Sequence, residues 1–581
     1  MPAGERVTQP FPAPASTGTP TVASAGAPTA ASTGAKPAVA PPSWATRWLV
    51  PTFTDIFFIA LVLWIFASGP MGWTALLADG DTGWHIRTGE FVLDHGYVPD
   101  HDLFSFSKPG ETWYAWEWLS DVIFALLHRQ WGLKAITLLA GVLIIASVAI
   151  LLAHMTWRGA NFFIALPLAL MAVGVSSIHY LARPHVFTLF LLPICLWMLD
   201  RDRRAPSGAV WWLIPIAVVW TNLHGGYMAL IACLGLLALA SALECVPDWL
   251  ARRTPTALPV LKRYALLAAG CAAATFVNPF GYRLHLHIAN YLQSEFIHEV
   301  VQEFQSPSFR GESMRQFELL LFAGLLLVGV ALLRPIGSRA RDYAAMLWVV
   351  YWAHQSLSSV RHATIYVLVA APFIATALSD CIAAWVARQP RNSVPAILTA
   401  IGNDLAPKFR TVSVWAIVFL AILPFINSDR MKWPTDFPKE KFPLALLHQH
   451  KQLLQTRRVF TTDQWGDYLI YQSYPQQRVF IDGRSDFYGA KLGRQYMRLL
   501  GADLDWEKVL NQHRFDVVLA PRDWPLVALL KLHPDWQLIG EDRKLKENEA
   551  FLFARRVPLT SPPRARTMAR TLDIPHRRRE D

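Results

Sequence analysis

The sequence predicts an α-helical polytopic membrane protein with a small C-terminal α/β domain outside the membrane. Hydrophobic residues make up 53% of the 581 residues and charged residues only 17%, a balance that excludes an ordinary soluble protein. A spanning helix needs about 20 mostly apolar residues. About eleven candidate segments can be marked, and they lie at 53–76, 134–154, 160–179, 185–199, 209–222, 227–246, 264–277, 316–333, 343–359, 363–380 and 411–427.

The basic residues of the loops predict how these segments are oriented. If the N-terminus lies inside, the inner loops repeatedly carry Arg and Lys, whereas the outer loops are longer and comparatively poor in basic residues. Cytoplasmic loops of membrane proteins show this excess of positive charge. It explains much of the formal charge of +11 and makes nucleic-acid binding the weaker explanation. We therefore predict a multi-pass membrane protein with a cytoplasmic N-terminus and an extracytoplasmic C-terminal domain.

Composition divides the chain into four predicted regions. Residues 1–48 are rich in Ala, Pro, Thr and Ser. Because such a segment cannot bury enough apolar surface to fold, we predict that it is a disordered cytoplasmic tail. Residues 49–430 are the predicted transmembrane domain. Residues 431–558 alternate strand-like and helical runs and predict the extracytoplasmic α/β domain. The basic, Pro-rich residues 559–581 predict a second disordered tail.

Within the α/β domain, three strand-like runs and three helical runs can be marked. The predicted strands are 458–462, 478–482 and 515–520, and the predicted helices are 465–473, 488–500 and 523–532. The stretch Asp482-Gly-Arg-Ser-Asp486 ends the second strand-like run. Its acids, with nearby tyrosines, suit carbohydrate contact, but a turn with a local salt bridge is the favoured interpretation.

Two stretches in long outer loops predict helices that lie in the membrane interface. Residues 119–131 are amphipathic and too short to span, and they follow the first outer loop, 77–118. Residues 282–304 form a second such stretch, after Asn278-Pro279-Phe280-Gly281.

The unusual polar residues gather at the predicted outer ends of the spans. Ionisable groups at membrane depth cost about 2.5–3.5 kcal/mol each on insertion scales, so they are rarely incidental. Because the clusters share one end, we predict that they form a single site. The clusters are Asp79-Gly-Asp81, Arg183-Pro-His185, Asn222-Leu-His224, Asn278-Pro and Arg361-His362.

The first cluster lies in the run Asp79-Gly-Asp-Thr-Gly-Trp-His85. Asp81 and His85 are four residues apart, so on a helix they share one face. The pair could be a general base with its proton partner, or two metal ligands. Asp79 and Asp81 could also bind a divalent metal together, although no full ligand set can be named. The alternative is that Asp79 or Asp81 only caps a helix.

This loop resembles that of the GT-C superfamily of polytopic glycosyltransferases, which includes protein O-mannosyltransferases and the aminoarabinose transferase of lipid A. In those enzymes the first outer loop carries an Asp, then a run of helix and a Gly at a turn. Here Asp81 is followed by Trp84, His85 and Gly96. The resemblance covers about 50–430 in architecture and 77–131 in motif, and it is closer to uncharacterised bacterial members than to any enzyme of known substrate.

The chain departs from the superfamily at one position. An acid often follows the first Asp there, and here that position is Thr82. Asp79 and Glu90 are the candidates to replace that acid.

The resemblance implies transfer of a sugar from a polyprenyl-phosphate-linked donor to a lipid, glycan or protein acceptor. It places this reaction at the outer face of a bacterial inner membrane, with the C-terminal domain in the periplasm. Such a reaction needs a carboxylate to accept the proton of the acceptor hydroxyl and cations to hold the leaving phosphate. Asp81 fits the first role, with Asp79 and His85 beside it in the predicted catalytic group. The predicted substrate-binding residues are Glu117, Arg183, His185, His224, Arg361 and His362.

Each substrate-binding residue also has a structural interpretation. Arg183 could cap a broken helix, Glu117 could cap the interfacial helix, and Arg361-His362 could anchor at the interface. At the level of the whole chain, the alternatives are a transporter or flippase of a lipid-linked or anionic substrate, and a non-catalytic membrane scaffold. Transporters place ionisable groups near the bilayer midplane and often repeat their halves, whereas no internal repeat is visible here.

Overall fold

The computed structural model describes residues 48–67, 72–333, 342–426, 433–543 and 549–559. The two predicted disordered tails, 1–48 and 559–581, lie outside these residues except for Trp48 and Leu559. The predicted division into four regions therefore stays a prediction.

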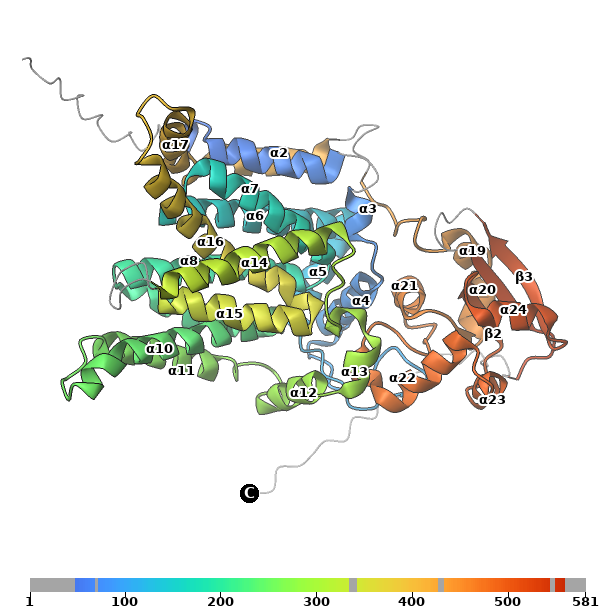
Figure 1. Cartoon of the computed structure of the whole chain (residues 1–581). Coiled ribbons are helices and arrows are strands. Elements are labelled where there is room, and N and C mark those ends of the chain that lie inside the picture. Colours follow the sequence, from blue (N-terminus) through green and yellow to red (C-terminus); the bar gives the residue numbers. More distant parts are fainter. Residues whose placement is uncertain (1–47, 68–71, 334–341, 427–432, 544–548, 560–581) are drawn as a thin grey trace, which may run out of the picture. The chain divides into compact units, whose positions relative to one another are not determined.

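Apolar helices form the largest part of the fold, and several of them run side by side in Figure 1. Helix α6 contacts its neighbours α2, α7, α8 and α16 along the chain's apolar core. The helices are α2 (Phe53–Ala67), α6 (Leu133–Arg158), α7 (Phe162–Ser176), α8 (His185–Arg204), α9 (Leu213–Leu223), α10 (Tyr227–Leu250), α11 (Leu258–Ala274), α14 (Glu312–Leu332), α15 (Tyr343–Ser358), α16 (Ala363–Val386), α17 (Val394–Leu405) and α18 (Val414–Ile422).

Among the described residues, five helical stretches are long and apolar enough to cross a membrane. A sixth is added if Val394–Phe409 and Val414–Phe425, bent by 65°, count as one span. The predicted class, a helical polytopic membrane protein with a small C-terminal sheet, is confirmed. The count of about eleven spans stays a prediction, because the remaining segments form shorter helices or, in α8, end in the charged run Asp200–Arg204.

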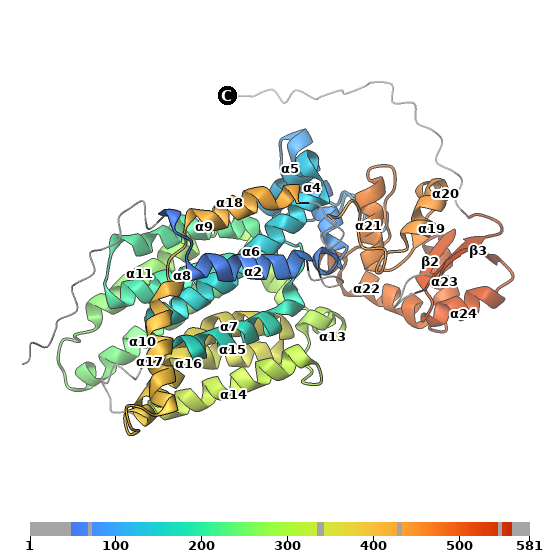
Figure 2. The same cartoon turned by 90° about the horizontal axis from the view of Figure 1, so that it is seen from above.

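The first and last apolar helices are joined by a buried carboxylate. Figure 2 shows α2 and α18 side by side, and they are in contact. Asp55 on α2 accepts hydrogen bonds from the hydroxyl of Ser413, at 2.7 Å, and from the hydroxyl of Thr52, at 2.7 Å. A buried carboxylate is tolerated when its oxygens are paired in this way.

Within the described residues, the loops between the apolar helices carry five more α-helices, the first being the short α3 (Trp73–Leu76). The first loop forms α4 (Asp81–His95) and α5 (Trp118–Trp131), which pack on one another. Gly89 permits this contact, since a Cβ there would overlap the backbone oxygen of Asp121. The second predicted interfacial stretch forms α12 (Tyr282–Leu292) and α13 (Glu295–Val300), and the side chain of Ser294 caps α13.

The C-terminal region forms one mixed four-stranded sheet in the order β1-β2-β4-β3, with β1 and β2 parallel and the other pairs antiparallel. Its buried strand residues come from apolar runs such as Val517–Ala520. The elements are α19 (Leu444–Gln449), α20 (Lys451–Thr456), β1 (Val459–Phe460), α21 (Asp463–Ser473), α22 (Ser485–Gly501), α23 (Trp506–Gln512), β2 (Val517–Pro521), α24 (Pro525–Leu532), β3 (Trp536–Asp542) and β4 (Ala550–Arg555).

One predicted strand of this domain is wrong. Residues 478–482 do not join the sheet; Val479 instead pairs with the first loop, where its N–H donates to Phe104 O and its carbonyl accepts from Phe106 N, both at 2.9 Å. The partner of Val479 comes from a loop more than 370 residues earlier in the chain. Strands β3 and β4 were not predicted.

A buried arginine fastens the same two segments together. The guanidinium of Arg484 donates to Asp482, at 2.7 Å, and to Asp102 of the first loop, at 2.8 Å. Its charge also lies over the ring of Trp113, with 4.4 Å to the centroid. The turn with a local salt bridge is therefore what Asp482-Gly-Arg forms.

Removing this arginine should destabilise the protein strongly. In Arg484→Met, Asp102 and Asp482 would be left buried without their cation, a defect that costs about 3–5 kcal/mol. We expect a clearly lower Tm in thermal unfolding of the detergent-solubilised protein. The matched control is Arg498→Met, because Arg498 forms an exposed pair with Asp505 and such pairs contribute about 0–1 kcal/mol. Equal Tm values for the two variants would contradict this account of the buried pair.

Candidate functional site

The site is built around Asp81, the first residue of α4. Its Oδ2 lies 2.6 Å from Nη2 of Arg183, and Nη1 of the same guanidinium lies 3.0 Å from Oδ2 of Asp79. Glu303 adds a third carboxylate at 3.6 Å. The N-cap residue of α4 is Gly80, so the capping interpretation is wrong for Asp79 and for Asp81. Asp79 lies before that cap and accepts the backbone N–H of Asp81, at 2.9 Å.

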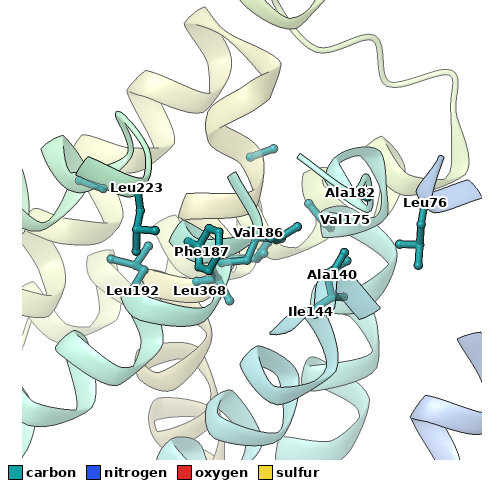
Figure 3. Close-up of a cluster of buried hydrophobic side chains, with 14 of the residues drawn as sticks. Leu76, Ala140, Ile144, Val175, Ala182, Val186, Phe187, Leu192, Leu223 and Leu368 are labelled. Atoms are coloured by element: carbon teal, nitrogen blue, oxygen red, sulfur yellow. The ribbon is translucent and has the colours of Figure 1, made fainter. Parts of the chain in front are cut away.

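Buried apolar residues next to the site residues hold these polar residues in position. Figure 3 shows Leu76, Ala182, Val186 and Leu223 within one buried cluster, and each of them stands within three residues of a predicted site residue. The N–H of Ala182 donates to Leu76 O at 2.7 Å, and the Thr82 hydroxyl donates to Ala182 O at 2.9 Å. Thr82 therefore connects α4 to the segment that carries Arg183.

Burial sets the protonation of Asp81. Its side chain is 3% exposed, and this burial raises the pKa of Asp81 to about 7, although the charge of Arg183 acts in the opposite direction. Arg183 is more accessible, with 26% of its side chain exposed. The site therefore has a partly exposed guanidinium, that of Arg183, in contact with a buried carboxyl group whose pKa is about 7.

A second carboxyl group, Glu117, lies between two histidines. Its oxygens are 3.8 Å from Nε2 of His85 and 3.6 Å from Nε2 of His224. Burial raises the pKa of Glu117 to about 8. Glu117 occupies the N-cap position of α5, but its side chain makes no capping hydrogen bond. The capping interpretation of Glu117 therefore does not describe its side chain.

Both histidines have a fixed second contact. Nδ1 of His224 accepts the N–H of Gly226, at 2.9 Å, so its Nε2 carries the proton that faces Glu117. Nδ1 of His85 lies 2.6 Å from Oδ1 of Asp121, and both groups are fully buried. Burial raises the pKa of Asp121 and holds that of His85 well below its usual range. His85 is thus paired with Asp121 and adjoins Glu117, and the predicted Asp81–His85 proton pair is not among the contacts of these residues.

The remaining predicted residues lie near this group without contacting Asp81. Arg361 stacks over the ring of Phe304, at 4.5 Å, and its charge acts on Glu117, His224 and Glu303. Nε2 of His185 lies 2.6 Å from His179 O, and Nδ1 of His362 lies 3.2 Å from Gln355 O.

Three further acids that were not among the predicted site residues also lie at the site. Asp121, Glu303 and Asp467 were not predicted, yet each borders the Asp81–Glu117 group. Asp121 had a signal, since it is an acid in the predicted interfacial helix 119–131, four residues after Glu117. Asp467 had none, because it belongs to α21, far along the chain.

The opposite end of the helices has its own ion pairs. His154 and Arg158 at the end of α6 contact Asp200 on α8, and Arg203 lies 2.6 Å from Asp342 before α15. These contacts join three apolar helices. The basic residues predicted only to set topology therefore also hold helix ends together.

A metal ion is not assigned to the site. Over the part of the chain that the structure describes, no group of three or more His, Cys, Asp or Glu residues is arranged to hold one. Binding by Asp79 and Asp81 stays a prediction, and the ion pairs of Arg183 occupy one oxygen of each.

Comparison with known proteins gives structural likenesses only. No protein-family model matches the sequence, and no curated protein matches it. The structure is similar to the apo form of the oligosaccharyltransferase of Archaeoglobus fulgidus, with a TM-score of 0.48, 13% identity, and coverage of 81% of this chain and 69% of that one. It is also similar to apo ArnT from Cupriavidus metallidurans, with a TM-score of 0.44, 15% identity, and coverage of 86% and 97%.

These likenesses concern the fold. The residues of the site carry the function proposed below.

The raised pKa of Glu117 predicts how stability changes with pH. The folded chain keeps the proton of Glu117 up to about pH 8, whereas the unfolded chain releases it near 4.5. Raising the pH through this window therefore lowers the free energy of unfolding. Glu117→Gln cannot titrate, so its Tm should fall less than the native Tm between about pH 5 and about pH 8. Differential scanning fluorimetry measures both slopes.

The control for this measurement is Glu111→Gln. Glu111 is an acid of the same loop, but 57% of its side chain is exposed. Its variant should keep the native dependence of Tm on pH. Equal slopes for Glu117→Gln and the native chain would show that Glu117 does not bind this proton.

Proposed function

We propose that this chain is a membrane glycosyltransferase that moves a sugar from a polyprenyl-phosphate-linked donor to an acceptor hydroxyl at the outer face of a bacterial inner membrane. The observation that carries the proposal is the contact of buried Asp81 with the partly exposed Arg183, at 2.6 Å. The proposed proton acceptor and the proposed phosphate-binding cation are therefore side by side.

Asp81 is the proposed general base. An efficient base has a pKa near the operating pH, and burial brings the pKa of Asp81 to about 7. In the reaction the acceptor O–H bond breaks, its proton passes to Asp81, and the acceptor oxygen bonds to the anomeric carbon. The bond from that carbon to the phosphate oxygen breaks, and its electron pair leaves with the phosphate.

Arg183 is the proposed partner of that leaving phosphate. Negative charge grows on the phosphate in the transition state, and a guanidinium can hold two of its oxygens with parallel hydrogen bonds. Arg361 supplies a second positive charge nearby, since it acts on Glu117 and Glu303. His185, His224 and His362 are the proposed polar wall of this region. A polyprenyl tail would remain in the bilayer beside the apolar helices.

Glu117 and His85 have a supporting role in this proposal. Glu117 keeps its proton near neutral pH and can donate a hydrogen bond to a sugar hydroxyl or ring oxygen. His85 and His224 fix its carboxyl group from two sides. Asp79 holds Arg183 in place through the 3.0 Å ion pair.

The alternatives have less support from particular residues. A transporter or flippase would place its ionisable groups near the middle of the helices. Asp81, Glu117, Arg183 and His224 instead lie where helices begin or end. A scaffold would not need a carboxyl group with a pKa near 7 beside an arginine, so the transferase remains the function that the site favours.

The test is sugar transfer by Asp81→Asn compared with the native chain. Both are purified in nanodiscs and given radiolabelled polyprenyl-phosphate sugars with a crude envelope extract as acceptor. Loss of a general base lowers the rate by about 10²–10⁴-fold, so we expect transfer by the native chain and almost none by the variant. Asp94→Asn is the control, because Asp94 lies on the same helix, is 57% exposed and pairs with Arg129. Transfer at the native rate by Asp81→Asn would contradict the proposed role.

A further inference from the structure

The α/β domain reaches the Asp81 site through helix α21. The backbone N–H of Gly80 donates to Oε1 of Gln464 at 2.6 Å. A Cβ on Gly80 would overlap Gln464 O and lie 2.8 Å from Cβ of Asp467, and one on Gly83 would lie 2.7 Å from Cβ of Tyr471. The two glycines, three residues apart, therefore let α21 and α4 approach to backbone contact.

This approach places the carboxyl group of Asp467 beside that of Asp81. Asp467 is fully buried, and its Oδ1 accepts the N–H of Gly483 at 2.9 Å. A Cβ on Gly483 would overlap Oδ1 of Asp81 and lie 3.1 Å from Oδ2 of Asp467. Gly483 thus marks the point where the two carboxyl groups meet.

The facing oxygens have no other partner. Among the described residues, neither Oδ1 of Asp81 nor Oδ2 of Asp467 receives a hydrogen bond from a donor. Buried polar atoms in folded proteins are almost always paired. Two carboxyl oxygens satisfy one another only when a proton lies between them, because two ionised groups at this spacing repel strongly.

The surrounding charges favour a single shared proton. The charges that act on the pair are those of the acids Asp79, Asp463 and Asp482 and of Arg183, which also pairs with Glu303. Arg183 binds Oδ2 of Asp81, so the negative charge of the pair is best placed on Asp81. The proton then resides on Asp467, and burial raises the pKa of Asp467 well above its usual value.

We propose that Asp467, a residue of the α/β domain, is a positioning residue of the transferase site that holds Asp81 through one shared proton. The inference rests on the function proposed above. Asp467 donates this proton to Oδ1 of Asp81, which leaves Oδ2 turned toward Arg183 and the substrate. The proton of Asp467 stays in place during transfer, and the acceptor's proton goes to Asp81. The α/β domain is then one wall of the site.

The variants Asp467→Ala and Asp467→Asn separate positioning from folding. Alanine removes the donor, and misplacement of a reacting group can cost about 100-fold in rate, so kcat should fall by about this factor with little change in the KM for the donor. Asparagine keeps a donor of the same shape and should restore most of that loss. Asp436→Asn is the control: Asp436 accepts the hydroxyl of Tyr468 on the same helix, at 3.0 Å, without touching Asp81.

If Asp467→Ala has the same kcat as the native protein, the proposal is contradicted. Equal losses in Asp467→Ala, Asp467→Asn and Asp436→Asn, with lowered Tm in all three, would also overturn it, because that pattern reports only the packing of α21.

An infrared measurement tests the shared proton without any substrate. A protonated buried carboxyl group gives a carbonyl band that ionised carboxylates lack, and at pH 7 this band should lose intensity in Asp467→Asn but not in Asp436→Asn. An unchanged band would overturn the shared proton even if the kinetics agreed. If native protein transfers no sugar from any donor while the band behaves as expected, the transferase function fails and the Asp81–Asp467 pair stands as a structural finding.

Discussion

Burial of Asp81 beside Arg183 is the constraint on which the rest of the site depends. A carboxylate that is 3% exposed needs a compensating partner, and the guanidinium at 2.6 Å supplies it. That contact requires the start of α4 to lie against the segment before α8, which the backbone bond of Ala182 to Leu76 and the hydroxyl of Thr82 secure. Because the same arginine also binds Asp79 and Glu303, its single charge is shared among three carboxylates. Asp81 can therefore keep a raised pKa while it stays in place.

The polar residues at helix ends were accessible to prediction. An apolar run fixes where a span ends, so Arg183 and His224 could be assigned to the same side as Asp81 from the sequence. The structure places Arg183 in contact with Asp81 and His224 next to Glu117. The predicted break also has a counterpart, since α9 ends at Leu223 and His224 precedes the start of α10 at Tyr227. Local spacing was less informative for His85, since its partner Asp121 comes from the adjacent helix.

The contribution of the α/β domain could not be predicted, because it depends on contacts between distant segments. Asp467 lies in an ordinary amphipathic helix, and only the docking of α21 on Gly80 and Gly83 brings it to Asp81. Residues 478–482 had the pattern of a sheet strand, but the first loop offered the closer partner and the buried Arg484 fixed it there. These contacts connect the α/β domain to the first loop, which carries Asp81.

The most direct test of the account is a structure of the chain with a non-hydrolysable polyprenyl phosphonate sugar bound in nanodiscs. The account predicts the phosphonate oxygens within hydrogen-bond distance of Arg183. It also predicts that the anomeric carbon faces Asp81 and that the prenyl tail runs along the apolar helices. A phosphonate bound at the other end of the helices, beside Arg158 and Arg203, would contradict it, because Asp81 could not then reach the reacting carbon.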